Sequence, residues 1–187
     1  PHFKEWQKII VSSDKDFIQL CGDKTILYRP IQDEILNSKR IVEQYGIHPN
    51  NFALARAVCG DKSDNLDGVG GVGLKTIAKR FPFLAEEKRH SVASLLETCR
   101  EVETKLKVHE NIMDKTPLID NNYILMQLYF PSMSPLAKQK IKASVEELDY
   151  SFNKTGVKSM MAEDGFIAYD WSVLYQTFQR IISNERD

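Results

Sequence analysis

The segment that most constrains the fold is the glycine-rich stretch GDKSDNLDGVGGVGLKTIAKRFP, from Gly60 to Pro82, which holds five of the nine glycines in the chain. The run from Gly68 to Gly73 reads as a flexible turn, and it opens directly into a helix that includes IAKRF. Glycines let a backbone approach a ligand closely, and the free N–H groups at a helix start attract phosphate oxygens. The stretch therefore predicts a turn that contacts a phosphate backbone.

Two other phosphate-binding motifs fit this turn poorly. A Walker-type loop requires the pattern GxxxxGK[ST], but Leu74 follows Gly73, so the lysine comes one place late, and no apolar strand precedes the turn. The dinucleotide-binding fingerprint GxGxxG fits Gly68, Gly70 and Gly73 literally, yet the segment before it, GDKSDNLD, is not a strand. Neither motif is favoured.

Basic side chains on the following helix extend the predicted contact with phosphates. Lys75 and Lys79 lie four residues apart, which places them on one face of a helix, and Arg80 comes next. No side chain suited to reading bases is evident, so we expect binding that is indifferent to sequence and sensitive to salt. The candidate nucleic-acid contacts are Gly68, Gly70, Gly71, Gly73, Lys75, Thr76, Lys79 and Arg80.

Four aspartates form a candidate metal site. Asp14 and Asp16 follow the short apolar run IIV, and Asp61 and Asp64 lie three apart, the spacing of one helical turn, just past a helix end. If the two pairs meet in space, they form an anionic pocket suited to hard divalent cations such as Mg²⁺, which serve in pairs in phosphodiester cleavage. The same residues also fit plain turns and helix caps, where aspartate is common.

Residues 1–45 alternate between strand and helix patterns. KIIVSS and TILYRP read as strands, and each is followed by a helical stretch, the second of which ends near Tyr45. This order favours an α/β layer with a parallel sheet, in which ligands gather beyond the carboxyl ends of the strands. Asp14 and Asp16 fall at such an end.

The rest of the chain reads mainly as helices. A helix is predicted from Pro49 through FALARAV, where Gly60 ends it, and packed helices are predicted between residues 86 and 113. LIDNNYILMQLYF is predicted to be a strand or an extended segment, whereas SPLAKQKIKASVEEL and DWSVLYQTFQRII read as helices. We therefore expect three regions, 1–45, 46–113 and an α/β or helical extension over 114–187.

Composition excludes several other classes of protein. The formal net charge of −1 gives no global basic field, so any site for nucleic acid must be a local patch. The three cysteines stand far apart, which argues against a zinc site or a disulfide framework and suits a reducing cytoplasm. No apolar run approaches the ~20 residues of a membrane span. We expect a monomeric cytoplasmic protein that does not contact membranes.

Two motifs, SSDKDFIQL and ARAVCGDKSDNLDGVGGVGLKTIAKRF, closely resemble those of the 5′ nuclease family. This family includes the 5′→3′ exonucleases and flap endonucleases of phages and the 5′-nuclease domain of bacterial DNA polymerase I. The match runs from Ile9 to Pro82 in the family's order and spacing. The resemblance implies the remnant of a parallel-sheet, PIN-like nuclease core in 1–45 and a helix-hairpin-helix (helix-three-turn-helix) DNA-binding domain in 46–113.

The resemblance also implies ligands and partners. Two Mg²⁺ or Mn²⁺ ions and one K⁺ ion are expected, and the substrate would be DNA with a 5′ end or 5′ flap, gripped by its duplex part. The first metal-binding aspartate, the other acidic ligands, the basic catalytic side chains and the helical arch of the family's N-terminal half have no counterpart here, so we expect that half as a partner. The implied divalent-metal ligands are Asp14, Asp16, Asp61 and Asp64, and the implied K⁺ ligands are the carbonyls of Val69 and Val72.

Two functional hypotheses follow. The first is a metal-dependent 5′ nuclease, a 5′→3′ exonuclease or flap endonuclease of DNA replication and repair in a bacterium or a phage-infected cell, weak or inactive as this piece alone. The second is a helix-hairpin-helix module that holds duplex DNA and performs no chemistry. Retention of all four aspartates favours the first hypothesis, whereas the missing half favours the second for the isolated piece.

Overall fold

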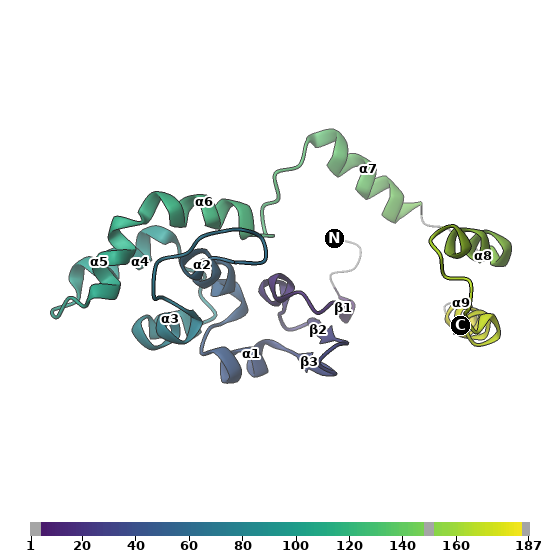
Figure 1. The fold of residues 1–187 in the computed structure, drawn as a ribbon, viewed down its shortest axis with the longest axis horizontal. Coiled ribbons are helices and arrows are strands. Elements are labelled where there is room, and N and C mark those ends of the chain that lie inside the picture. The colour runs from purple at the N-terminus through teal and green to yellow at the C-terminus, as the bar shows by residue number, and fades with distance from the viewer. Residues whose placement is uncertain (1–4, 148–151, 185–187) are drawn as a thin grey trace. The chain divides into compact units, whose positions relative to one another are not determined.

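The computed structural model describes residues 5–147 and 152–184 and divides the chain into two compact units, Pro1–Pro131 and Ser132–Asp187. The first unit holds a small sheet and packed helices, and the second is helical (Figure 1). The division into regions at residues 45 and 113 stays a prediction. Within the described ranges, no helix combines the length and the apolar character needed to cross a membrane.

The sheet at the start of the chain is mixed. Strands β1 (Lys8–Val11) and β2 (Thr25–Arg29) pair in parallel, and the 3-10 helix η1 (Lys15–Leu20) connects them. The predicted strand, helix and parallel strand are therefore confirmed. A third strand, β3 (Glu34–Leu36), was not predicted and pairs antiparallel with β2 before the predicted helix α1 (Ser38–Tyr45) begins.

Strand β1 has one face toward the core and one toward solvent. Ile10 packs against the core, whereas Ile9 and Val11 lie on the opposite face, because side chains alternate along a strand, and are 60% and 64% exposed. Within the described residues β1 has a neighbour on one side only, β2. An apolar face and a strand edge are therefore left open.

Helix α2 (Pro49–Cys59) lies at the centre of the first unit (Figure 1). The Nδ1 atom of His48 caps its start by accepting a hydrogen bond from the backbone N–H of Asn50, and Gly60 ends it with a φ of +73°. Most of its side chains are buried, and Phe52 is fully enclosed. The predicted start at Pro49 and stop at Gly60 are confirmed.

Four helical segments follow the glycine-rich turn and complete the core, each contributing a buried apolar side chain. In α4 the start is fixed by a capping box, in which Ser91 and Ser94 each accept a hydrogen bond from the other's backbone N–H. The predicted helix after the turn and the packed helices in 86–113 are confirmed. The segments are α3 (Leu74–Arg80), η2 (Pro82–Ala85), α4 (Val92–Glu101) and α5 (Lys107–Asp114).

Helix α6 (Thr116–Met126) corrects one prediction, because LIDNNYILMQLYF was expected to be a strand or an extended segment. Its buried positions, Ile119, Asn122 and Met126, recur at intervals of three and four, which is the period of a helix. The polar Asn122 interrupts the apolar stripe and hides this period in the sequence. α6 packs against α2 over much of its length.

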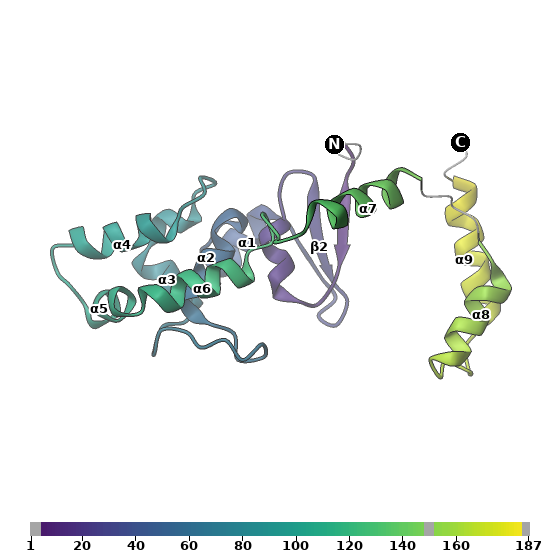
Figure 2. The same cartoon turned by 90° about the horizontal axis from the view of Figure 1, so that it is seen from above.

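The second unit contains α7 (Pro135–Glu146), α8 (Lys154–Glu163) and α9 (Trp171–Asn184). α7 and α9 were predicted, and α8 was not. α8 and α9 are neighbours (Figure 2), and the hydroxyl of Tyr175 on α9 donates a hydrogen bond to the carbonyl of Lys154 at the start of α8. Many apolar side chains of this unit remain exposed.

Candidate functional site

An acidic loop, defined as residues 60–68, leaves the end of α2 and is held there by backbone contacts. Its ends are joined by two hydrogen bonds of 2.8 Å between the backbones of Asp61 and Leu66. A Cβ atom added to Gly68 would lie 2.0 Å from the carbonyl oxygen of Cys59, and one added to Gly60 would lie 2.4 Å from the nitrogen of Gly68. Only glycine fits at these two positions, so the loop is fixed against the helix end.

β1 ends before the first aspartate pair: Asp14 is the residue before η1, and Asp16 lies in the first turn of η1. The carboxylate of Asp14 caps η1 by accepting a hydrogen bond of 2.8 Å from the backbone N–H of Asp16. The capping role weighed from the sequence is therefore present at Asp14. Asp16 lies in the first turn of η1 and is free to direct its carboxylate elsewhere.

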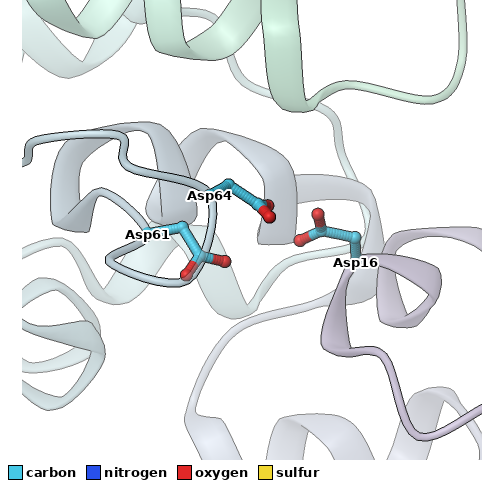
Figure 3. A group of neighbouring side chains, drawn as sticks. All are labelled: Asp16, Asp61 and Asp64. Carbon is cyan, nitrogen blue, oxygen red and sulfur yellow. The ribbon is translucent and has the colours of Figure 1, made fainter.

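The carboxylates of Asp16, Asp61 and Asp64 converge, as Figure 3 shows. One oxygen from each lies within 4.8 Å of the others, although the residues come from η1 and from the acidic loop. We call these three residues the acidic cluster. Asp14 is not among them but lines the adjoining cavity of about 330 Å³, together with Ser13, Lys15, Arg56, Asp61, Ser63 and Asp64.

Arg56, on the last turns of α2, is a site residue that the sequence analysis missed. Its Nη2 atom lies 3.2 Å from Oδ1 of Asp16 and also contacts Oδ2 of Asp61. The Arg56 side chain is 13% exposed, and its Nε atom is buried without a hydrogen-bond partner among the described residues. The sequence carries no local signal for this contact, because Asp16 lies 40 residues away from Arg56 along the chain.

The two carboxylates that contact Arg56 differ in their electrostatic setting. The hydroxyl of Ser63, followed by its backbone N–H and by Arg56, lowers the pKa of Asp61, although partial burial opposes this. Burial raises the pKa of Asp16, and the attraction of Arg56 only partly offsets it. Asp61 is therefore the more firmly held anion of the two.

The donor set of the acidic cluster fits a divalent cation. Mg²⁺ and Mn²⁺ favour carboxylate oxygens and keep several waters, and the cluster offers oxygens from three carboxylates beside a cavity of about 330 Å³. The single counter-charge in contact, Arg56, leaves the cluster with an excess of negative charge.

The glycine turn continues directly from the acidic loop. Gly68 is closed against α2, whereas a Cβ atom at Gly70, Gly71 or Gly73 would meet nothing within 4 Å. Gly71 has a φ of +76°, a conformation that favours glycine. The open side of the turn therefore exposes backbone that a ligand can approach closely.

The remaining predicted contacts lie on both sides of this turn. The side chains of Val69 and Val72 are buried, and the Val69 carbonyl accepts a hydrogen bond of 3.0 Å from the N–H of Val72. α3 starts after Gly73 without a side-chain cap. The basic residues Lys75, Lys79 and Arg80 are exposed on α3, and Thr76 is half-buried.

Sequence comparison finds relatives over most of the chain, although no protein-family model matches it. A 5′-3′ exonuclease of Aquifex aeolicus (strain VF5) is 26% identical over 162 residues, which cover 82% of this chain and 51% of that protein. DNA polymerase I of Bacillus subtilis (strain 168) is 32% identical over 162 residues, which cover 84% of this chain and 17% of that protein. The chain thus spans about half the length of the exonuclease and a smaller part of the polymerase.

Structure comparison finds bacteriophage T5 nucleases. The T5 5′-exonuclease with bound divalent metal ions (zinc) matches 63% of this chain and 42% of its own, with a TM-score of 0.54 and 22% identity. A T5 flap endonuclease in a pseudo-enzyme–product complex with DNA and metal ions matches 65% and 43%, with a TM-score of 0.53 and 20% identity. At this identity the likeness shows a shared fold. The predicted resemblance and fold class are confirmed.

Proposed function

We propose that this chain, whose sequence and fold resemble those of the 5′ nuclease family, supplies the C-terminal part of the active site of a metal-dependent 5′ nuclease. The observation that carries the proposal is the convergence of Asp16 with Asp61 and Asp64 within 4.8 Å. The acidic loop and η1 would have no structural need to bring three carboxylates together, because like charges at this distance repel. A cation bound among them removes that cost.

The acidic cluster would hold Mg²⁺ or Mn²⁺, with Asp14 in the wall of the cavity as a further ligand through water or directly. Two such ions, when bound, activate a water and stabilise the leaving oxygen of a phosphodiester. The chain's own residues position the carboxylates: Gly60 and Gly68 fix the acidic loop, and Asp14 fixes the first turn of η1.

The DNA contact of the proposed nuclease is the glycine turn with the start of α3. Gly70, Gly71 and Gly73 present open backbone, and Lys75 and Lys79 present charge, so the surface suits the phosphates of a duplex. Binding would be indifferent to base sequence and would weaken with salt. A K⁺ ion held by the carbonyls of Val69 and Val72 would order the turn. The T5 flap endonuclease that was solved with DNA and metal ions shares this fold, which supports a contact with DNA.

The substrate of the whole enzyme would be DNA with a 5′ end or a 5′ flap, cut during replication and repair in the cytoplasm of a bacterium or a phage-infected cell. The remaining acidic and basic groups of the site would come from the N-terminal half of the nuclease, with which this chain would form one monomeric active unit. The open face of β1, with Ile9 and Val11 exposed, is compatible with further structure packing there.

Two measurements test this function. The first is Mn²⁺ binding to the 187-residue chain, followed by electron paramagnetic resonance. Binding should fall at least about tenfold in Asp61→Asn/Asp64→Asn, since two of three ligands are lost, and should be unchanged in the control Asp120→Asn, whose exposed carboxylate lies on α6.

The second measurement is cleavage of a labelled 5′-flap duplex by this chain, alone and together with an N-terminal half, in Mg²⁺ and in EDTA. Cutting is expected with both halves and Mg²⁺ and should stop in EDTA. Metal-independent cutting, or no cutting by the intact enzyme, contradicts a metal nuclease. Metal-independent duplex binding without cutting would favour the alternative, a helix-hairpin-helix binding module.

A further inference from the structure

Arg56 occupies the position between two of the proposed metal ligands. The same atom, Nη2, contacts Oδ1 of Asp16 and Oδ2 of Asp61, so one nitrogen occupies the space between two carboxylates that would hold the metal. The arginine comes from α2, whose residues on either side are buried, and this limits how far its backbone can move. The position of Arg56 beside the two aspartates is therefore fixed by α2, the helix that precedes the acidic loop.

The charge of Arg56 compensates the acidic cluster in the absence of metal. Three carboxylates with oxygens within 4.8 Å repel one another, and a guanidinium in contact with two of them reduces that repulsion. The cluster can therefore form in the folded chain before any cation arrives.

The same contact hinders a cation from reaching these two carboxylate oxygens. The two carboxylate oxygens that accept hydrogen bonds from Nη2 already have a cation beside them. A divalent ion in contact with the same oxygens would be repelled by the guanidinium. We propose that Arg56 is an internal counter-ion that competes with divalent metal for Asp16 and Asp61, so that metal binding at this position displaces the guanidinium.

The geometry of the contact supports exchange. Arginine–carboxylate pairs are frequently bidentate, with two nitrogens on one carboxylate, whereas here a single nitrogen, Nη2, serves both aspartates. Arg56 acts through the carboxylates and is a positioning residue. This inference rests on the proposed metal site.

The test compares the wild-type chain with Arg56→Gln and with a matched control, Arg29→Gln. Arg29 is also a mostly buried arginine paired with a carboxylate, at 3.2 Å from Glu34, and its buried Nε also has no partner among the described residues. Its other hydrogen bond goes to the carbonyl of Ser13, at 3.4 Å, so neither contact involves a carboxylate of the acidic cluster. The measurements are the melting temperature in EDTA and in Mn²⁺, and the affinity for Mn²⁺ by titration calorimetry.

Competition predicts opposite effects of Arg56→Gln with and without metal. The melting temperature in EDTA should fall by several degrees and should be largely restored by Mn²⁺, while the affinity for Mn²⁺ should rise by about 5-fold to 150-fold, the usual range of coupling between two binding events. Arg29→Gln should lower the melting temperature equally in EDTA and in Mn²⁺ and should leave the affinity unchanged.

Other outcomes separate the failure of this inference from failure of the proposed function. Equal or weaker Mn²⁺ binding by Arg56→Gln overturns the competition and leaves the metal site standing. No Mn²⁺ binding by either the wild-type chain or the variant overturns the metal site and the competition with it. If the glutamine variant does not fold even with Mn²⁺, Arg56→Met, which is also neutral and of similar length, replaces it, and an affinity no higher than that of the wild-type chain overturns the competition.

Discussion

The side-chain amide of Asn122 donates a hydrogen bond of 2.8 Å to the carbonyl oxygen of Asp67. The same nitrogen donates to the carbonyl of Ala57 at 3.0 Å, so one buried side chain of α6 joins the last turns of α2 to the acidic loop. The loop that carries Asp61 and Asp64 is thus held by two sets of contacts, the close backbone packing at Gly60 and Gly68 and the hydrogen bond from the Asn122 amide.

Replacing Asn122 with leucine should destabilise the chain by about 2–4 kcal/mol, because two buried carbonyl groups lose their donor. The free energy of unfolding from urea titration measures this. Asn121→Leu, at the neighbouring exposed position of the same helix, is the control and should change stability by less than about 0.5 kcal/mol. Equal effects of the two substitutions would contradict the structural role of the Asn122 amide.

Two glycines of the turn should respond differently to alanine. Gly68→Ala should cost at least about 2 kcal/mol of stability, since the added Cβ would overlap the backbone of Cys59. Gly70→Ala should stay within about 0.5 kcal/mol, because nothing lies near its Cβ. If the turn approaches phosphates closely, Gly70→Ala should still weaken duplex binding, as measured by fluorescence anisotropy, and unchanged binding would remove Gly70 from the interface.

Lys75→Ala with Lys79→Ala should weaken duplex binding for all sequences alike. Each phosphate contact removed should reduce the slope of log K against log salt by about 0.9. Anisotropy titrations over a range of NaCl concentrations measure the slope. Lys138→Ala with Lys142→Ala provides the control, since these exposed lysines are also four apart on a helix, α7, and a similar loss from both pairs would indicate general charge attraction.

Stability should fall with pH below about 6.5 because of His109, since an unfolded histidine takes up a proton near that pH. Burial, and then the positive charge of Arg80, lowers the pKa of His109, and its Nδ1 accepts the backbone N–H of Leu106. The unfolded chain therefore binds more protons than the folded chain in this window, and stability is lost as the pH falls.

Urea titrations of the wild-type chain and of His109→Gln measure the effect of His109 on stability. Glutamine can still accept the capping hydrogen bond. The variant should lose less stability on acidification, and parallel curves would contradict this assignment.

The parts of the fold that could be predicted follow from local rules. Pro49 at a helix start, Gly60 at its end and Ser134 before α7 act within a few residues of themselves, so the sequence alone indicates these bounds. The strand β3 is only three residues long and carries no such signal. The helix α6 was missed because its inward face includes Asn122, whose partners lie on two other segments.

The sequence allowed the aspartates of the candidate site to be predicted, but not Arg56, the cationic side chain that contacts them. Aspartates at a strand end and past a helix end suggested a shared pocket, and the structure brings Asp16, Asp61 and Asp64 together, while Asp14 turns back to cap η1. The reason expected for Asp61 and Asp64 was helical spacing, but they lie on a turn closed by the Asp61–Leu66 pair. Arg56 could be assigned only once η1 and the end of α2 were known to face each other.

The open edge of β1 has a practical consequence for handling the isolated chain. Within the described ranges β1 pairs with β2 alone, so its other edge, beside exposed Ile9 and Val11, offers a template onto which another strand can add, the usual start of edge-to-edge aggregation. Purified alone, the chain should self-associate as its concentration rises. Ile9→Lys would place a charge on this edge and should reduce the self-association. Co-expression with a segment that covers the edge should have the same effect without the substitution.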